Sequence, residues 1–126
     1  MSGVLIDTSA WINHLKAADA AVIDILSTGR ALTHPMVLGE LSLGTPKDRE
    51  RTLEAISLLE RTNAASMSEV LGFVEKDKLY GLGCGLVDVT LLMCTLITPG
   101  ATLMTADNRL AALADRFKIL HRTALH

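Results

Sequence analysis

The most apolar segment of the chain is residues 86–97, LVDVTLLMCTLI, which is apolar on nearly every face when read at 3.6 residues per turn. This pattern predicts a helix buried in the centre of the fold. Asp88 falls in its first turn, and a carboxylate among apolar neighbours is costly unless it is paired, hydrogen-bonded or bound to a metal. Its place near the helix N-terminus contributes only ~0.3–1 kcal/mol. We therefore expect another partner for Asp88.

Shorter apolar runs on both sides of this segment predict strands that alternate with helices. Strands are expected at residues 4–6, 31–33, 102–105 and 117–120, and the ambiguous residues 63–67 are compatible with an edge strand. Helices are expected at residues 10–16, 19–29, 36–43, 47–61, 66–79 and 109–116. The alternation predicts an α/β domain whose mostly parallel sheet of four to five strands has helices on both faces.

Local signals give some of these helices a start and an inward face. Asp19 is the expected N-cap of the second helix, and Ser66 with Glu69 has the spacing of a capping box. The inward residues of the second helix are expected to be Val22, Ile23 and Leu26. Those of the 47–61 helix are expected to be Leu53, Ile56 and Leu59.

A length of 126 residues with 49% hydrophobic content predicts a single domain, residues 1–126, with a proper core. The apolar run around Asp88 is too short to span a bilayer, so we expect no membrane association. The N-terminal residues show no basic region followed by an apolar one, so we expect no secretory signal. Cys84 and Cys94 have neither zinc spacing nor a disulfide framework. These features indicate a cytoplasmic protein.

Three further acids lie in or directly after apolar runs: Asp7, Glu40 and Asp107. Asp7 and Asp107 follow expected strands, and the carboxyl ends of parallel strands are where ligands bind. No Arg or Lys lies inside another apolar run to pair with these acids. Because their ligand atoms are all hard oxygens, the four acids predict a site for Mg²⁺ or Mn²⁺ and not for zinc.

Each acid has an expected role at this catalytic metal site. Asp7 and Asp88 are the expected direct ligands, Glu40 binds through water or orients the attacking water, and Asp107 completes a second position. The hydroxyls of Ser9 and Thr105 are expected to fix the carboxylate orientations, although both residues could equally stabilise turns.

Four short motifs occur in a fixed order: DTS at 7–9, E-x-x-x-G at 40–44, G-x-x-D at 85–88 and T-x-D at 105–107. Together they resemble the PIN-domain nucleases, and more narrowly the VapC-type toxins of bacterial toxin–antitoxin pairs. The resemblance implies a Mg²⁺ or Mn²⁺ site, cleavage of RNA, and a homodimer held inactive by a VapB-like antitoxin. The chain departs from many relatives in lacking an aromatic residue at position 110, a change we expect to affect packing and not chemistry.

The net charge of −2 is unusual for a protein that binds nucleic acid. Setting the four site acids aside leaves ten acidic residues against 12 basic ones, a balance of +2 that permits such a partner. A non-catalytic PIN-like binding partner is the alternative, but all four acids are present. A phosphorelay receiver or a haloacid-dehalogenase-type phosphatase would need a second acid beside Asp7, where the chain has Thr8 and Ser9.

Several other residues admit two interpretations. Trp11 either packs in the core or forms, with Leu15, a groove for an antitoxin helix. Arg109 either holds a phosphate or is an ordinary exposed charge. The histidines form no close ligand pair and are expected to be non-catalytic: His14, His34, His121 and His126.

Overall fold

The structure is a computed structural model that describes residues 2–123. In this part of the chain the elements follow in the order β1 (Val4–Ile6), α1 (Thr8–Lys16), α2 (Ala20–Ser27), β2 (Ala31–Thr33), α3 (Pro35–Ser42), α4 (Arg49–Ser57), β3 (Glu60–Arg61), α5 (Met67–Asp77), α6 (Leu86–Leu96), β4 (Thr102–Met104) and α7 (Asn108–Arg116). None of the helices between residues 2 and 123 is long and apolar enough to cross a membrane.

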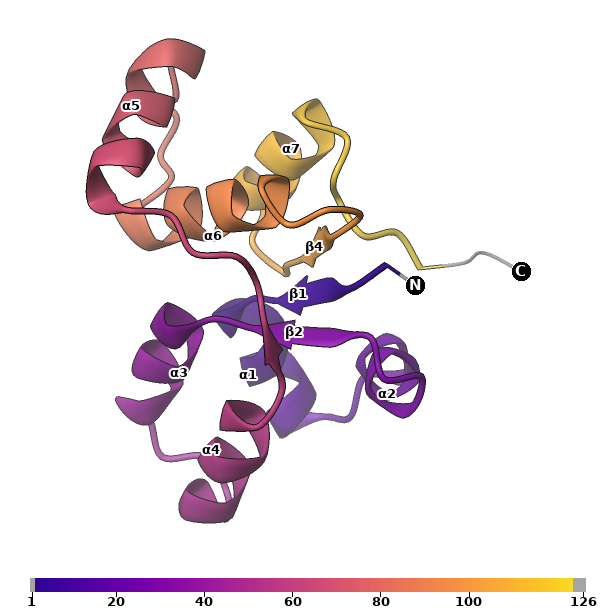
Figure 1. The fold of residues 1–126 in the computed structure, drawn as a ribbon. Helices are drawn as coiled ribbons and strands as arrows, with labels where there is room; N and C mark the ends of the chain where they lie inside the picture. The colour runs from indigo at the N-terminus through magenta and orange to yellow at the C-terminus, as the bar shows by residue number, and fades with distance from the viewer. Residues whose placement is uncertain (1, 124–126) are drawn as a thin grey trace.

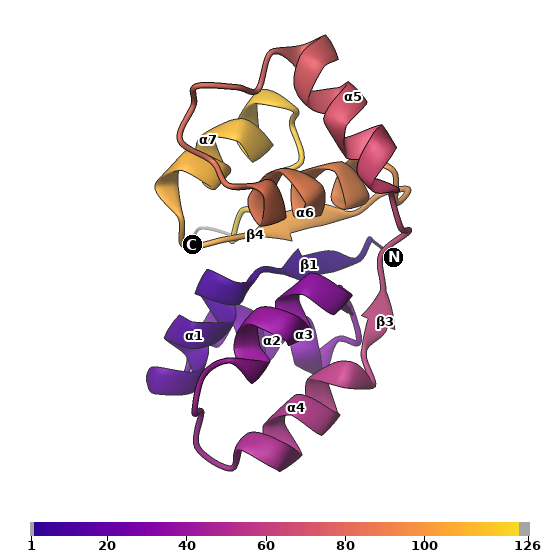
Figure 2. The same cartoon turned by 90° about the vertical axis from the view of Figure 1, so that its left-hand side faces the viewer.

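The strands form one sheet in the order β3-β2-β1-β4, and every pairing is parallel. Figures 1 and 2 show the sheet between two helical layers, with α1 to α4 on one face and α5 to α7 on the other. The predicted α/β architecture with a parallel sheet covered on both faces is therefore confirmed. Residues 117–120 add only an isolated bridge between Leu103 and Leu120 and not a fifth strand.

The predicted central helix is α6, which lies directly on the sheet (Figure 2). Its buried residues are Val89, Thr90, Leu91, Leu92, Cys94 and Thr95. The inner strands β1 and β2 are buried along their whole length, as continuous apolar strands in a covered parallel sheet should be. The core thus lies on both sides of the sheet and fixes the positions of the strand ends.

One predicted helix proves to be a helix followed by a strand. The helix expected at 47–61 ends at Ser57, and Glu60–Arg61 forms the edge strand β3 beside β2. The edge strand suggested at 63–67 is therefore wrong by several residues. The backbone groups at the open edge of β2 offer hydrogen-bond partners over Glu60–Arg61, which a further turn of exposed helix would leave unpaired.

The predicted inner face of α2 is also partly wrong. Val22 and Ile25 are fully buried, whereas Ile23 is 50% exposed and Leu26 is 37% exposed. The two buried positions are three apart and so lie on one narrow face of this eight-residue helix. The capping predictions are confirmed, because the Asp19 side chain caps α2.

The helix after the edge strand starts as predicted. Ser66 and Glu69 form the capping box of α5, in which each side chain accepts the backbone N–H of the other residue. The helix ends at Asp77, two residues before the predicted end.

Candidate active site

The sheet register places the first and last motifs side by side. Ile6 at the end of β1 pairs with Met104 at the end of β4, and the next residues are Asp7 and Thr105. The chain leaves β1 and β4 toward helices on opposite faces of the sheet, which is the switch point where open α/β sheets bind ligands (Figure 2).

Asp7 is the most buried of the four predicted acids, with 3% of its surface exposed. Its carboxylate accepts the Ser9 hydroxyl at 2.8 and 3.0 Å, the backbone N–H of Ala10 at 2.8 Å, and the hydroxyl of Thr105. The Ala10 bond makes Asp7 the N-cap of α1. These donors fix the orientation of the carboxylate, which is the arrangement that the predicted roles of Ser9 and Thr105 require.

The pKa of Asp7 is raised, chiefly because burial penalises the charged carboxylate. The hydrogen bonds from Thr105, Ala10 and Ser9 oppose this rise, and the negative charge of Asp107 adds to it. An uncompensated buried charge is costly, so Asp7 is a carboxylate that a bound cation would stabilise.

Asp88 lies in the first turn of α6 and is half-buried. Its pKa is raised first by burial and then by the negative charge of Asp107, with smaller contributions from Asp7 and Glu40. A backbone hydrogen bond involving Gly85 acts in the opposite direction. Asp88 is therefore within electrostatic reach of the other three predicted acids.

Glu40 and Asp107 are exposed and are held by local hydrogen bonds. The Thr8 hydroxyl donates to Glu40 Oε1 at 2.5 Å, which joins the start of α1 to α3. Asp107 caps α7, because its Oδ1 accepts the backbone N–H groups of Arg109 at 2.8 Å and Leu110 at 3.1 Å. The helices α1 and α7 begin at Thr8 and Asn108, earlier than predicted, because Asp7 and Asp107 are their N-caps.

All four acids line one pocket of about 210 Å³ at this edge of the sheet. The lining residues are Asp7, Thr8, Ser9, Ile12, Glu40, Asp88, Leu91 and Asp107. As the side chains stand, no three or more His, Cys, Asp or Glu residues within 2–123 are gathered closely enough to hold a metal ion. Burial is the main cause of the raised pKa of Asp7 and Asp88, and repulsion among the carboxylates adds to it and favours this separation.

The donor set nevertheless fits Mg²⁺ or Mn²⁺ by its chemistry. The pocket offers carboxylates and hydroxyls with no thiol or imidazole in its lining, and hard oxygen ligands of this kind suit these ions. The buried carboxylate of Asp7 has no cation among its hydrogen-bond partners in the described residues. A bound cation would offset both its burial and its repulsion with Asp107 and Asp88.

One contact of the site was missed from the sequence. The sequence pattern indicates Thr8 only as the residue in place of a second acid, yet its hydroxyl donates a hydrogen bond to Glu40. The N-cap preference of Asp was the available signal, because a helix that starts at Thr8 brings this side chain toward the neighbouring helix.

The ambiguous residues have defined positions. Trp11 is 3% exposed and belongs to the core, and its side chain also lines an open pocket together with Leu15. Arg109 Nη1 donates to the Gly83 carbonyl at 3.2 Å and so ties α7 to the loop before α6. Gly83 has a φ of +84°, which favours glycine, and a Cβ there would lie 2.8 Å from Arg109 Nη1 and displace this guanidinium.

None of the described histidines lines the acid pocket: His14, His34 and His121 lie elsewhere. His126 lies outside the described residues.

Comparison with known proteins identifies close relatives. No family model matches the chain. Two curated relatives, each called Ribonuclease VapC32, come from Mycobacterium tuberculosis strains CDC 1551 / Oshkosh and ATCC 25618 / H37Rv. The chain is 41% identical to each over 109 residues, which cover 86% of this chain and 88% of the relative. With this identity, the parallel α/β fold and the four motifs in order, the chain belongs to the VapC-type toxins of the PIN-domain family.

Proposed function

We propose that this chain is a Mg²⁺- or Mn²⁺-dependent endoribonuclease toxin. The observation that carries the proposal is the pocket in which four separate parts of the chain each contribute one carboxylate. The relation to Ribonuclease VapC32 supports RNA as the substrate. Growth arrest is the biological effect that we propose from the resemblance to the toxins of toxin–antitoxin pairs. A non-catalytic binding partner would need Asp7 and Asp107 only as the N-caps of α1 and α7, which does not account for the carboxylates of Asp88 and Glu40 in the same pocket.

Asp7 and Asp88 are the residues that would hold the ion directly, and Asp107 would complete a second position. Glu40 would bind through water or orient the attacking water, with its Oε1 held by Thr8. When bound, the ion would neutralise the phosphate, activate a water and stabilise the leaving oxyanion. Ser9 and Thr105 would keep Asp7 in a single orientation throughout.

We further propose a VapB-like antitoxin and a homodimer as the biological context. The family of the chain supports the antitoxin. Co-purification with the product of a small neighbouring reading frame would identify it. The homodimer is an expectation from family resemblance, and a sedimentation velocity profile of a monomer at micromolar concentration would contradict it.

The decisive experiment compares wild type with Asp7→Asn. After induced expression, RNA ends are mapped, and the purified proteins are then incubated with the RNA so identified in Mn²⁺ or in excess chelator. We expect growth arrest only on expression of the wild type. In vitro, we expect RNA cleavage only by the wild type in Mn²⁺. Cleavage that persists in chelator would overturn the metal dependence. Absence of both toxicity and RNA cleavage in wild type would favour the non-catalytic alternative.

A further inference from the structure

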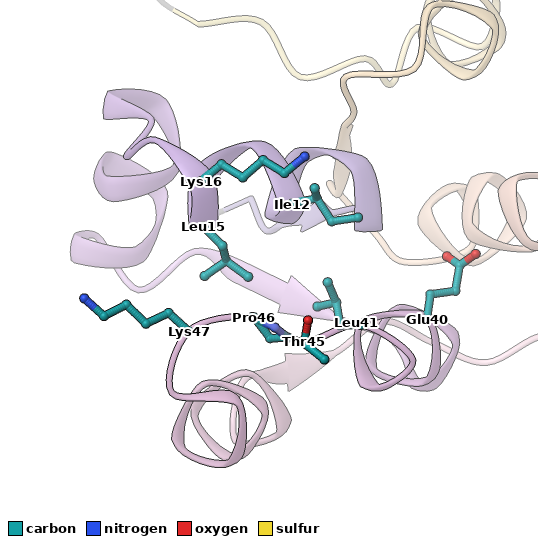
Figure 3. A pocket seen from close by; sticks show the side chains of 9 residues that line it. Ile12, Leu15, Lys16, Glu40, Leu41, Thr45, Pro46 and Lys47 are labelled. Carbon is teal, nitrogen blue, oxygen red and sulfur yellow. The ribbon is translucent and has the colours of Figure 1, made fainter.

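A groove of about 370 Å³ lies between α1 and α3, directly beside the acid pocket. Figure 3 shows Ile12 and Leu15 of α1 on one side and Leu41, Thr45 and Pro46 on the other, with Glu40 at one end. Ile12 is 41% exposed and Leu15 is 37% exposed, so apolar surface remains open to solvent along the groove.

The groove is continuous with the acid pocket, because Ile12 and Glu40 line both. A chain that places one phosphate among the four carboxylates can therefore continue past Glu40 into the groove without leaving the surface. This continuity distinguishes the groove from the other apolar surface around α4, which does not share a lining acid with the site.

Two cations lie on the groove, in contrast to the acids at its end. Lys16 extends over the α1 side, with its ammonium on the side of Ile12, and Lys47 lies at the end remote from Glu40 (Figure 3). Both side chains are exposed and neither makes an ion pair within residues 2–123. An apolar floor with free cations at its edge is complementary to single-stranded nucleic acid, which presents apolar base and sugar faces between phosphates.

We propose that this groove binds the nucleotides of the RNA next to the phosphate that is cleaved. Ile12 and Leu15, the exposed apolar side chains of the groove, contact the base and ribose faces, and Lys16 and Lys47 contact the phosphates. The inference rests on the proposed function, because it takes the acid pocket as the place of cleavage. It assigns substrate affinity to residues outside the catalytic carboxylates.

The test measures RNA binding in an Asp88→Asn background, in which the RNA is not cut. The probe is a fluorescein-labelled single-stranded RNA of mixed sequence, about 16 nucleotides long. Fluorescence anisotropy in Mg²⁺ gives its affinity over a range of salt concentrations. We expect Lys16→Ala and Lys47→Ala to weaken binding and each to reduce the slope of log affinity against log salt by about 0.7. Leu15→Ala should weaken binding without changing the slope, because it removes an apolar contact.

Matched controls come from α5, on the opposite face of the sheet (Figure 1). Lys76→Ala and Leu71→Ala replace an exposed lysine and a 54% exposed leucine there and should leave affinity and slope unchanged. An unchanged slope in both groove lysine variants, or no RNA binding by the background protein, would overturn the inference. An unchanged slope would instead favour a protein segment, such as one from an antitoxin, as the occupant of the groove. RNA cleavage by the wild type is measured separately. The experiments therefore distinguish a groove that does not bind RNA from a protein that is not a nuclease.

Discussion

The hydroxyl of Thr105 donates a hydrogen bond to Oδ2 of Asp7, which joins two residues 98 positions apart in the chain. The contact follows from the parallel pairing of β1 with β4, which ends one residue before each of them. Ser9 completes the arrangement, because its hydroxyl donates to Asp7 and its Oγ also accepts the Ala106 N–H at 2.9 Å. The buried carboxylate is thus oriented by the sheet itself.

Thr105→Val should therefore weaken cleavage while largely preserving the fold. Valine keeps the shape of the side chain but leaves Asp7 without one donor, so its carboxylate is less firmly oriented and its pKa rises further. Loss of such an orienting partner typically reduces metal affinity or activity by about 10–100-fold. The measurement is the Mn²⁺ concentration that gives half-maximal RNA cleavage.

Thr105→Ser restores the hydroxyl and should recover most of the activity. Thr102→Val, at the other end of β4, is the matched control, because the Thr102 side chain makes no hydrogen bond in the described part of the chain. If Thr105→Val and Thr102→Val need the same Mn²⁺ concentration, the hydroxyl does not support the site.

A second buried contact joins the helices that carry Glu40 and Asp88. His34 Nδ1 accepts the Met36 N–H at 3.0 Å and caps α3, while its Nε2 lies 3.4 Å from Sγ of Cys94 on α6. Because Nδ1 accepts, neutral His34 carries its proton on Nε2 and directs it toward the sulfur. His34→Ala should lower the free energy of unfolding by about 0.5–2 kcal/mol, the usual cost of a lost N-cap. Urea denaturation measures this loss.

The same residue predicts a pH dependence of stability. Burial, and then the charge of Arg61, lower the pKa of His34. The unfolded chain therefore binds more protons here than the folded one, so wild type should lose stability as pH falls below about 6.5. His34→Asn keeps an N-cap acceptor and should lose less over this range. His121, whose pKa is lowered in the same direction, is present in both proteins. Parallel pH profiles would contradict the role of His34.

The sequence predicted the elements wherever the local pattern and the tertiary environment agree. Strands β1 and β2, the capping box of α5 and the buried helix α6 were all predicted from apolar runs and caps. Strand β3 was missed because Glu60 and Arg61 have no strand pattern, and only the open edge of β2 makes them pair. The register of a sheet edge is a tertiary property that a local pattern does not contain.

The candidate site shows the same difference between what a local pattern predicts and what tertiary packing determines. Four acids in apolar runs were recognisable because such placement is costly without a partner, and the structure brings all four to one pocket. The Thr8–Glu40 hydrogen bond was not predicted, and of the residues that line the groove beside Ile12 only Leu15 was predicted to form one. Both depend on how α1 packs against α3, which residue spacing alone does not determine.

Trp11→Ala should destabilise the protein by about 3–5 kcal/mol, the usual range for removing a buried large aromatic side chain. The side chain is 3% exposed, and within the described residues its Nε1 is buried without a hydrogen-bond partner. Trp11→Phe removes that unpaired N–H along with part of the ring and should therefore cost less than the alanine variant. Thermal unfolding of both variants checks the order. A melting temperature for Trp11→Ala equal to that of wild type would contradict the core assignment.

The last prediction is that Asp88→Asn raises the melting temperature of the metal-free protein while abolishing cleavage. Burial and the charge of Asp107 raise the pKa of Asp88 in the folded state. The folded protein therefore binds more protons here than the unfolded one, and stability falls as pH rises from about 3.9 through the raised pKa. Asparagine keeps the shape of the side chain and removes the charge. The increase in melting temperature over wild type should therefore be largest at neutral pH and vanish near pH 3.5.

Metal gives an independent readout of the same residue. Ligands that bind only the folded state raise its stability by mass action, so Mn²⁺ should raise the melting temperature of wild type much more than that of Asp88→Asn. Asp19→Asn is the control, because Asp19 only caps α2 and asparagine is an equally good N-cap. Melting curves of the three proteins in Mn²⁺ and in chelator decide the matter. If Asp88→Asn melts below wild type in chelator and responds normally to Mn²⁺, Asp88 is a structural residue of α6 and the four-carboxylate site is wrong.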